Sequence, residues 1–178
     1  MLPKGYKMPE SNSQFMKLEI GANKFRILSD IVIGWEGWKN KKPFRHEGQE
    51  CRIMPEQVDL DNYGKPNIKH FWAMVIWDYK TQMVKTLEIT QSTVMSVIRD
   101  HEESEEWGDC KAYDITISKE GSGKETVYTV VMSPPKPIST EVENAYINAN
   151  IDLSKLFEGG YPQDIQTEDD PDSPKPPF

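Results

Sequence analysis

Alternating apolar and polar residues predict β-strands along most of the chain. From Gln14 to Trp38 the alternation has a period near two, and the Gly21-Ala22-Asn23 break predicts a short hairpin between two strands. The segment Lys69 to Lys80 is apolar in both alternating sets, which predicts a central strand that is covered on both faces or carries aromatic side chains outward. A turn at Thr81 and Gln82 then leads into a further strand, Met83 to Thr90.

The helical signals come later in the chain. Thr90 or Gln91 is expected to cap a helix that runs to about His101, with an apolar face made by Val94, Met95, Val97 and Ile98. Two further strands, Ala112 to Lys119 and Glu125 to Met132, flank a glycine-containing hairpin. The segment Thr140 to Phe157 predicts one or two short helices. Residues 34–52 carry Lys, Pro and Gly without apolar periodicity and predict a loop.

This order of elements indicates a mainly β fold. Several strands, one central helix and a hairpin follow the order of a five-stranded OB-type barrel with its helix between the third and fourth strands, followed here by short C-terminal helices. An SH3-like barrel or a small α+β sandwich would give a similar order.

Length and composition favour one domain with two flexible ends. We expect a flexible arm over residues 1–13, a domain over residues 14–160 and a disordered acidic tail over residues 161–178. No run of about eighteen apolar residues occurs and the N-terminus has no signal-like stretch, so a cytoplasmic protein that does not contact membranes is expected. Cys51 and Cys110 lie far apart and the histidines are scattered, so we expect neither a metal site nor another cofactor.

The net charge of −8 is unevenly distributed along the sequence. Residues 1–100 hold 15 Lys and Arg against 12 Asp and Glu, whereas residues 101–178 hold 6 against 17. A basic binding surface is therefore compatible with the acidic total.

The segment Gly34 to His46 interleaves aromatic rings with cations. Trp35, Trp38 and Phe44 alternate with Lys39, Lys41, Lys42 and Arg45, and Glu36 alone opposes these bases. Flat rings stack on unpaired bases and cations neutralise phosphates, so this mixture is typical of single-stranded nucleic-acid binding. The alternative to a binding role is structural: Trp35 anchors a loop to the core and the lysines are ordinary surface charges.

The central strand is a second candidate. Its alternation places Phe71, Ala73, Val75, Trp77 and Tyr79 on one face and Trp72, Met74, Ile76 and Asp78 on the other. The first set suits a narrow interior, which leaves Trp72 as an outward stacking platform, although the reverse assignment stays open. The expected contact residues are therefore Trp35, Trp38, Lys39, Lys41, Lys42, Phe44, Arg45, Tyr63, Lys69 and Trp72.

Catalytic chemistry has little support. The sequence has no phosphate-binding GxxxxGK[ST] loop and no GxSxG elbow, and Gly121 to Lys124 reads as a turn. A carboxylate run from Glu102 to Asp109 is typical of a solvated helix end, with metal-dependent nuclease activity as a remote alternative. We therefore expect a protein that is not an enzyme.

The last fifteen residues, DIQTEDDPDSPKPPF, form an acidic, proline-broken run that ends on an aromatic residue. A partner with a basic, hydrophobic pocket is expected to bind this segment through Asp169, Asp170, Asp172 and Phe178. The acidic second half also fits an acidic protein-interaction or DNA-mimic module, which is the main alternative.

Taken together, the GWEGWKNKKPFRH and FWAMVIWDY segments, the block WGDCKAYDITISKEGSGKETVYTVVMSPPKPIS and the acidic end resemble the phage-type single-stranded DNA-binding proteins. The resemblance covers roughly residues 15–139 and the tail. It implies an OB-fold that coats exposed single strands in DNA replication, recombination and repair, and a tail that recruits replication and recombination proteins. The sequence leaves open whether the chain is a monomer or a dimer and whether DNA or RNA is its ligand. The bacterial tail ends in an unbroken acidic run and Ile-Pro-Phe, whereas Pro171, Pro174 and Lys175 interrupt the acids here.

Overall fold

The computed structural model describes residues 15–159, which form an open antiparallel sheet of seven strands and two α-helices. The strands are β1 (Gly21–Ile27), β2 (Val32–Lys39), β3 (Lys42–Glu47), β4 (Ile68–Asp78), β5 (Met83–Ile89), β6 (Asp114–Glu120) and β7 (Val127–Met132). The helices are α1 (Ser92–Glu102) and α2 (Thr140–Ala149), and a 3-10 helix, Leu153–Phe157, follows α2.

Strand β4 organises the sheet. Along one edge, its first half pairs with β2 and its last residues pair with β1, while the other edge pairs with β5. The resulting order is β3-β2-β4-β1-β6-β7, with β5 beside β4. Strands β1 and β2 therefore follow one edge of β4 and are separated by a bend at residues 28–31.

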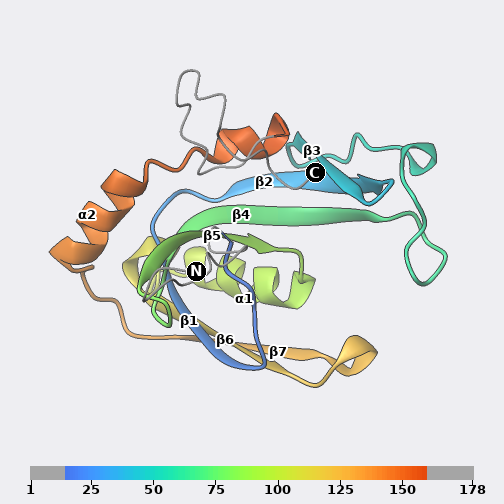
Figure 1. The fold of residues 1–178 in the computed structure, drawn as a ribbon. Helices are drawn as coiled ribbons and strands as arrows, with labels where there is room; N and C mark the ends of the chain where they lie inside the picture. Colours follow the sequence, from blue (N-terminus) through green and yellow to red (C-terminus); the bar gives the residue numbers. More distant parts are fainter. Residues whose placement is uncertain (1–14, 160–178) are drawn as a thin grey trace, which may run out of the picture.

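The sheet curves so that β2, β3 and β4 lie above β1, β6 and β7, with α1 between the two layers (Figure 1). We call the side of the sheet that faces α1 the inner face. Val94, Met95 and Ile98 of α1 pack there against Met74 and Ile76 of β4, together with residues of β1, β5 and β6. This cluster is the main hydrophobic core.

The C-terminal helices cover the opposite, outer face of β4. Leu153 and Leu156 pack against Phe71, Ala73 and Val75. Gly34 of β2 permits this contact, because a Cβ at this position would lie 2.9 Å from the ring of Phe157. From Ala73 to Asp78 every residue of β4 is buried, as expected for a strand covered on both faces, whereas residues 68–70 and Trp72 stay partly exposed.

Several expectations on the fold are wrong. The sheet is open and has seven strands, so it is not a closed five-stranded barrel, and α1 lies between β5 and β6. The hairpin expected at Gly21-Ala22-Asn23 is absent, because these residues begin β1. Residues 34–52 are not a loop throughout: β2 and β3 form a hairpin whose turn residues Asn40 and Lys41 have φ of 51° and 63°.

The remaining elements agree with the sequence pattern. The helix at 92–102, the β6–β7 hairpin and the two C-terminal helical segments lie where they were expected. Among residues 15–159, neither α-helix is long and apolar enough to span a bilayer. The predicted N-terminal arm and the acidic tail, including Asp169, Asp170, Asp172 and Phe178, lie outside the described residues.

A buried ion pair joins the neighbouring strands β1 and β6. Asp114 of β6 is fully buried, and its Oδ1 lies 3.0 Å from the Nε of Arg26 in β1. The hydroxyl of Tyr79 donates to the same oxygen at 2.7 Å, and the Nζ of Lys136 lies 3.1 Å from Oδ2. Burial raises the pKa of Asp114, but these partners outweigh it and hold the pKa below its usual range.

Candidate nucleic-acid interface

The first half of β4, with β2 and β3, presents aromatic side chains on the inner face beyond the reach of α1. The pairing register sets Trp35 opposite His70 on one side and His46 on the other. Because paired residues in an antiparallel sheet point to the same side, Trp35, His46 and His70 share a face. Phe44 and Trp72 lie two residues away from His46 and His70 and therefore share it too.

These five residues form what we call the inner aromatic strip: Trp35, Phe44, His46, His70 and Trp72. The rings of Trp35 and His70 lie 4.9 Å apart and are tilted by 44°, and those of Phe44 and His46 lie 6.0 Å apart at 78°. The Nε1 of Trp35 donates to the carbonyl of Gln49 at 3.0 Å, which fixes the indole on the sheet. Trp72 is the innermost member and packs against the main core.

Gly37 of β2 leaves room for this arrangement. A Cβ at Gly37 would lie 2.8 Å from the ring of Phe44 and 2.7 Å from the side chain of Val58. The ring of Phe44 therefore extends over a strand position that has no side chain. Trp35, Phe44, His70 and Trp72 stay half-buried, so the strip keeps ring surface accessible.

Three of the predicted contact residues lie on the outer face. Trp38 follows Gly37 and therefore points to the opposite face, the outer one, as Glu36 does. Arg45 and Lys69 are the cross-strand partners of Glu36, so they lie on the outer face as well. The guanidinium of Arg45 lies 3.3 Å from Glu36 and 3.2 Å from Glu88, so the protein itself already neutralises this cation. The predicted set is thus divided between the two faces.

Glu36 is an unusual carboxyl group. Its side chain is 6% exposed, and burial, together with a hydrogen bond and charge repulsion from Glu88, raises its pKa to about 8. Arg45 opposes this shift. The two carboxyl groups therefore hold a proton beside the guanidinium at neutral pH.

We expect the free energy of unfolding to fall as the pH rises from about 5 to 8. In this range the folded chain keeps the Glu36 proton, whereas the unfolded chain, with an ordinary Glu pKa near 4.3, has lost it. The slope has an upper bound of about 1.4 kcal/mol per pH unit. Denaturant titrations at several pH values measure it.

Glu36→Gln mimics the protonated form, so it should flatten this slope and stabilise the chain at pH 8.5. The control is Glu47→Gln on the exposed side of β3, which should keep the wild-type slope. An unchanged slope in Glu36→Gln would show that Glu36 is not the titrating group.

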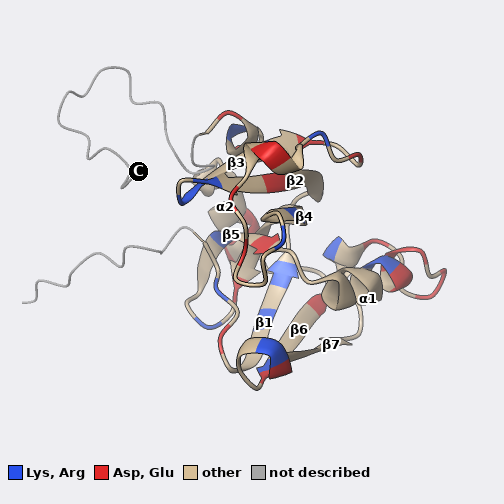
Figure 2. Ribbon diagram, turned by 90° about the vertical axis from the view of Figure 1, so that its right-hand side faces the viewer, with Lys and Arg blue, Asp and Glu red and all other residues tan. Residues whose placement is uncertain are grey.

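Lysines surround the turn of the β2–β3 hairpin. Lys39 pairs with Asp59 at 3.5 Å, and the backbone N–H of Asn40 donates to the same carboxylate at 2.6 Å. Lys41 and Lys42 are exposed and make no ion pair within residues 15–159. Lys and Arg positions are scattered among Asp and Glu positions on the described ribbon, most of which carries neither (Figure 2). The lysines at this turn are therefore a local cluster along the described ribbon.

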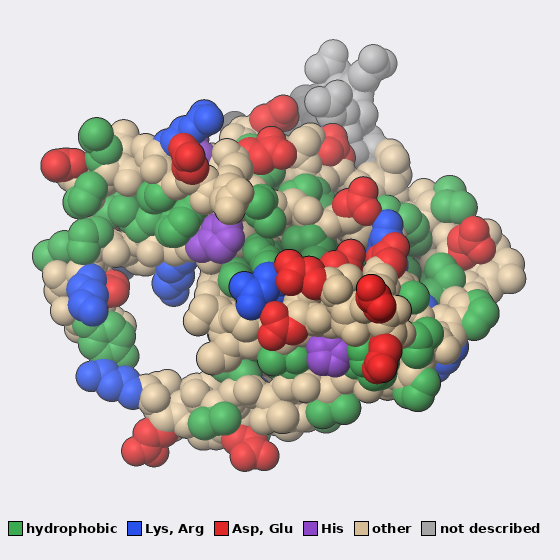
Figure 3. Space-filling view, turned by 180° about the vertical axis from the view of Figure 1, so that it is seen from behind, with side chains coloured by type: hydrophobic (Ala, Val, Ile, Leu, Met, Phe, Trp, Pro, Cys, Tyr) green, Lys and Arg blue, Asp and Glu red, His purple; other side chains and the backbone are tan. Residues whose placement is uncertain are grey.

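An opening passes through the molecule beside the inner aromatic strip (Figure 3). In the orientation of Figure 1, it lies below the start of β4, between α1 and the connection from β3 to β4. Hydrophobic side chains and a histidine gather along one rim, and Lys or Arg side chains along another (Figure 3). Tyr63, on the β3–β4 connection, is 60% exposed, and its ring contacts Lys124 at the end of the β6–β7 hairpin, so this contact joins the two segments.

Sequence reasoning missed His46 and His70 as members of the strip. Each follows or precedes a predicted contact residue, but only the cross-strand pairing brings them against Trp35 and Phe44. Lys124 was also missed, because a lysine in a glycine-rich turn carries no signal of its distant partner.

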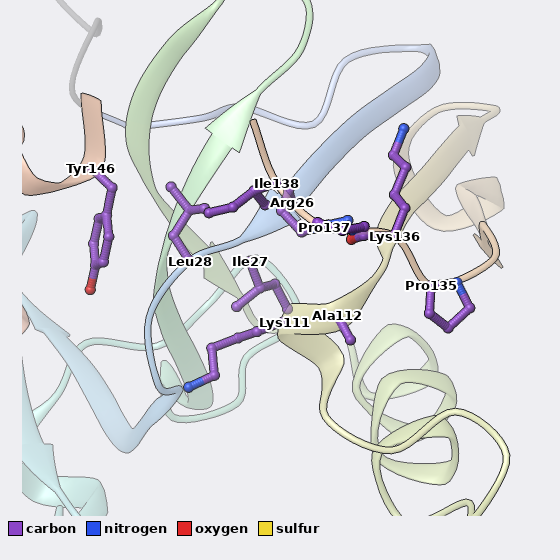
Figure 4. A pocket seen from close by; sticks show the side chains of 10 residues that line it. All are labelled: Arg26, Ile27, Leu28, Lys111, Ala112, Pro135, Lys136, Pro137, Ile138 and Tyr146. Atoms are coloured by element: carbon purple, nitrogen blue, oxygen red, sulfur yellow. Dashed lines mark hydrogen bonds between the residues drawn. The ribbon is translucent and has the colours of Figure 1, made fainter. Parts of the chain in front are cut away.

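A separate apolar cavity of about 440 Å³ lies between the end of β1, residues 135–138 and Tyr146 of α2 (Figure 4). The cations at its edge, Lys111 and Lys136, are paired with Asp30 and Asp114. The carboxylates of Glu102 and Asp109 approach Cys110, but Glu102 already accepts the Cys110 backbone N–H at 2.5 Å. Burial, together with a hydrogen bond to Glu102, raises the pKa of the Cys110 thiol to about 12, so this thiol stays protonated at neutral pH.

The inner aromatic strip, with the lysines near it, is therefore the strongest candidate site in the described chain. No protein-family model matches the chain, and a search of curated proteins finds no match.

Proposed function

We propose that this protein binds single-stranded DNA with little sequence preference and without catalysis. The observation that carries the proposal is the inner aromatic strip, in which Trp35, Phe44, His70 and Trp72 share one face beside an opening lined in part by cations. Every base has a π-face, so stacking on such rings tolerates any sequence. A duplex hides these faces, so the strip should discriminate against double-stranded DNA.

The rings would provide most of the affinity. Each stacked base contributes about 1–3 kcal/mol. Trp35 suits this role because the hydrogen bond from its Nε1 to the carbonyl of Gln49 holds the indole in place before a base arrives. His46 and His70 extend the stacking surface on either side of it.

Phosphate contacts would come from the lysines at the hairpin turn and along the outer boundary of the opening. Lys41 and Lys42 are exposed, and Lys65 and Lys124 lie on the two segments that bound the opening. With three or four such contacts, the log of the binding constant should fall with the log of the salt concentration with a slope of about −2 to −3.

The acidic segment 161–178 extends the proposal to protein partners. Here Asp169, Asp170, Asp172 and Phe178 would dock replication or recombination proteins while the sheet holds the strand, as in the phage-type single-stranded DNA-binding proteins that the chain resembles. The sequence of this segment supports this role through its charge and its terminal aromatic residue.

The test is a fluorescence titration of the full chain. Adding a mixed-sequence single-stranded oligonucleotide should quench tryptophan emission, because Trp35 and Trp72 are two of only five tryptophans. Duplex of the same sequence should give little change, and the salt slope should match the value above. A single-stranded RNA of the same sequence tests the choice of sugar.

Absence of quenching and of binding with either DNA would overturn the proposal. An acidic protein-interaction module would then be the better explanation of the charge distribution.

A further inference from the structure

Two segments that lie far apart in the sequence meet at the outer boundary of the opening. The ammonium group of Lys124, at the end of the β6–β7 hairpin, lies 4.6 Å from the centre of the Tyr63 ring on the β3–β4 connection. Figure 1 shows both segments projecting on the same side of the molecule, away from α2. This contact joins the upper and lower layers of the sheet on the far side of the opening from α1.

The Tyr63 segment is held in shape by its own hydrogen bonds. The Asp61 carboxylate accepts the backbone N–H groups of Tyr63 at 2.8 Å and of Lys65 at 3.0 Å. The Asp61 N–H donates to the carbonyl of Lys65 at 2.7 Å, which closes the turn. These bonds lower the pKa of Asp61, so the carboxylate stays ionised at neutral pH and continues to accept both hydrogen bonds. Tyr63 is therefore presented on a preformed arm.

The Lys124 segment is also preformed. Gly121 has φ of +80°, and a Cβ at this position would lie 2.4 Å from the carbonyl oxygen of Glu125. The Glu125 N–H donates to the carbonyl of Ser122 at 3.1 Å. The hydroxyl of Thr126 donates to the carbonyl of Gly123 at 2.9 Å. The hairpin end therefore folds back on itself and holds Lys124 toward the arm.

The contact between the two arms is weak by comparison. Both side chains are exposed, and an exposed cation–π pair favours the closed arrangement only about two- to fivefold. Each arm thus keeps its shape when the contact breaks. The Tyr63–Lys124 contact can therefore break and re-form often without unfolding either segment.

We propose that bound single-stranded DNA runs through the opening and is enclosed by it, and that the Tyr63–Lys124 contact opens to admit a strand that has no free end. This inference rests on the proposed function. The strand would lie between the inner aromatic strip and the β6–β7 hairpin, with Tyr63 and Lys124 closing over it. Enclosure would slow dissociation without adding any base-specific contact.

The test links the two arms covalently in the full chain. Tyr63→Cys and Lys124→Cys are introduced together with Cys51→Ser, since Cys51 is exposed, and a short bis-maleimide joins the new thiols. Cys110 is buried and its pKa is raised to about 12, so it should not react. The matched control is the same variant with both thiols capped separately by N-ethylmaleimide.

The capped protein should bind a linear and a circular single-stranded oligonucleotide equally. Protein linked before mixing should bind the circle at least tenfold more weakly than the capped control does. Protein linked after binding should remain on the circle through high salt and denaturant, because the two closed rings are then interlocked.

Release of the linked protein from the circle under denaturant would overturn the enclosure, as would equal binding of the circle by pre-linked and capped protein. Failure of the unsubstituted full chain to bind even the linear strand would instead refute the proposed function, so the two failures are distinguishable.

Discussion

Trp35→Ala should weaken binding of single-stranded DNA by about 5- to 150-fold, which corresponds to the loss of one stacked base. The indole lies on the inner face, is fixed by its hydrogen bond to Gln49 and contacts His70 at 4.9 Å between centroids. Removing it takes away the central ring of the strip. Equilibrium titration with a fluorescently labelled oligonucleotide measures the change.

The same strand supplies a matched control. Trp38 lies three residues along β2 and therefore on the outer face, away from the strip. Trp38→Ala should leave affinity nearly unchanged, and Trp35→Phe should keep most of it, because a flat ring remains. Equal losses in Trp35→Ala and Trp38→Ala would contradict an interface on the inner face.

The comparison between these two tryptophans shows where sequence reasoning stops. The residue types in Gly34 to His46 indicate the chemistry of the candidate site, but the segment was expected to be a loop, so the two rings could not be assigned to opposite faces. The structure makes it a hairpin with β3 at the edge of the sheet. Edge strands tolerate Lys, Arg and Pro on their free side, and this composition hides the strand pattern.

The central strand was easier to predict because burial on both faces leaves a continuous apolar run. The elements that pack on its outer face could not be predicted from the sequence, because the C-terminal helices contact Phe71 and Val75 from more than seventy residues away. The same limit applies to the barrel. Whether a curved sheet closes depends on pairing between distant edges, and here β4 is paired on both edges while β3 and β7 end the sheet.

Asp114→Ala should lower the free energy of unfolding by about 3–5 kcal/mol, the largest stability loss that we expect from a single substitution. Arg26 and Asp114 are 1% and 0% exposed, and their pairing joins β1 to β6. Removing the carboxylate leaves the guanidinium buried, and among residues 15–159 its one remaining hydrogen-bond acceptor is the carbonyl of Lys136 at 2.7 Å. Urea denaturation at pH 7 measures the loss.

The pH dependence separates the lost charge from the lost volume. The pKa of Asp114 is depressed in the folded chain, so its contribution is present above the unfolded pKa near 3.9 and disappears as the pH falls through the folded value. The gap between wild type and Asp114→Ala should therefore narrow in acid, below about pH 4. A gap that stays constant would indicate a cavity effect alone.

Two further variants define the contribution of the network. Tyr79→Phe removes a hydrogen bond to the buried carboxylate and should destabilise by about 1.5–3 kcal/mol, less than Asp114→Ala because the ion pair with Arg26 survives. Asp30→Ala breaks the exposed pair with Lys111 and should leave the unfolding midpoint almost unchanged. A loss in Asp30→Ala as large as in Asp114→Ala would show that charge removal in general, and not this buried tether between β1 and β6, controls stability.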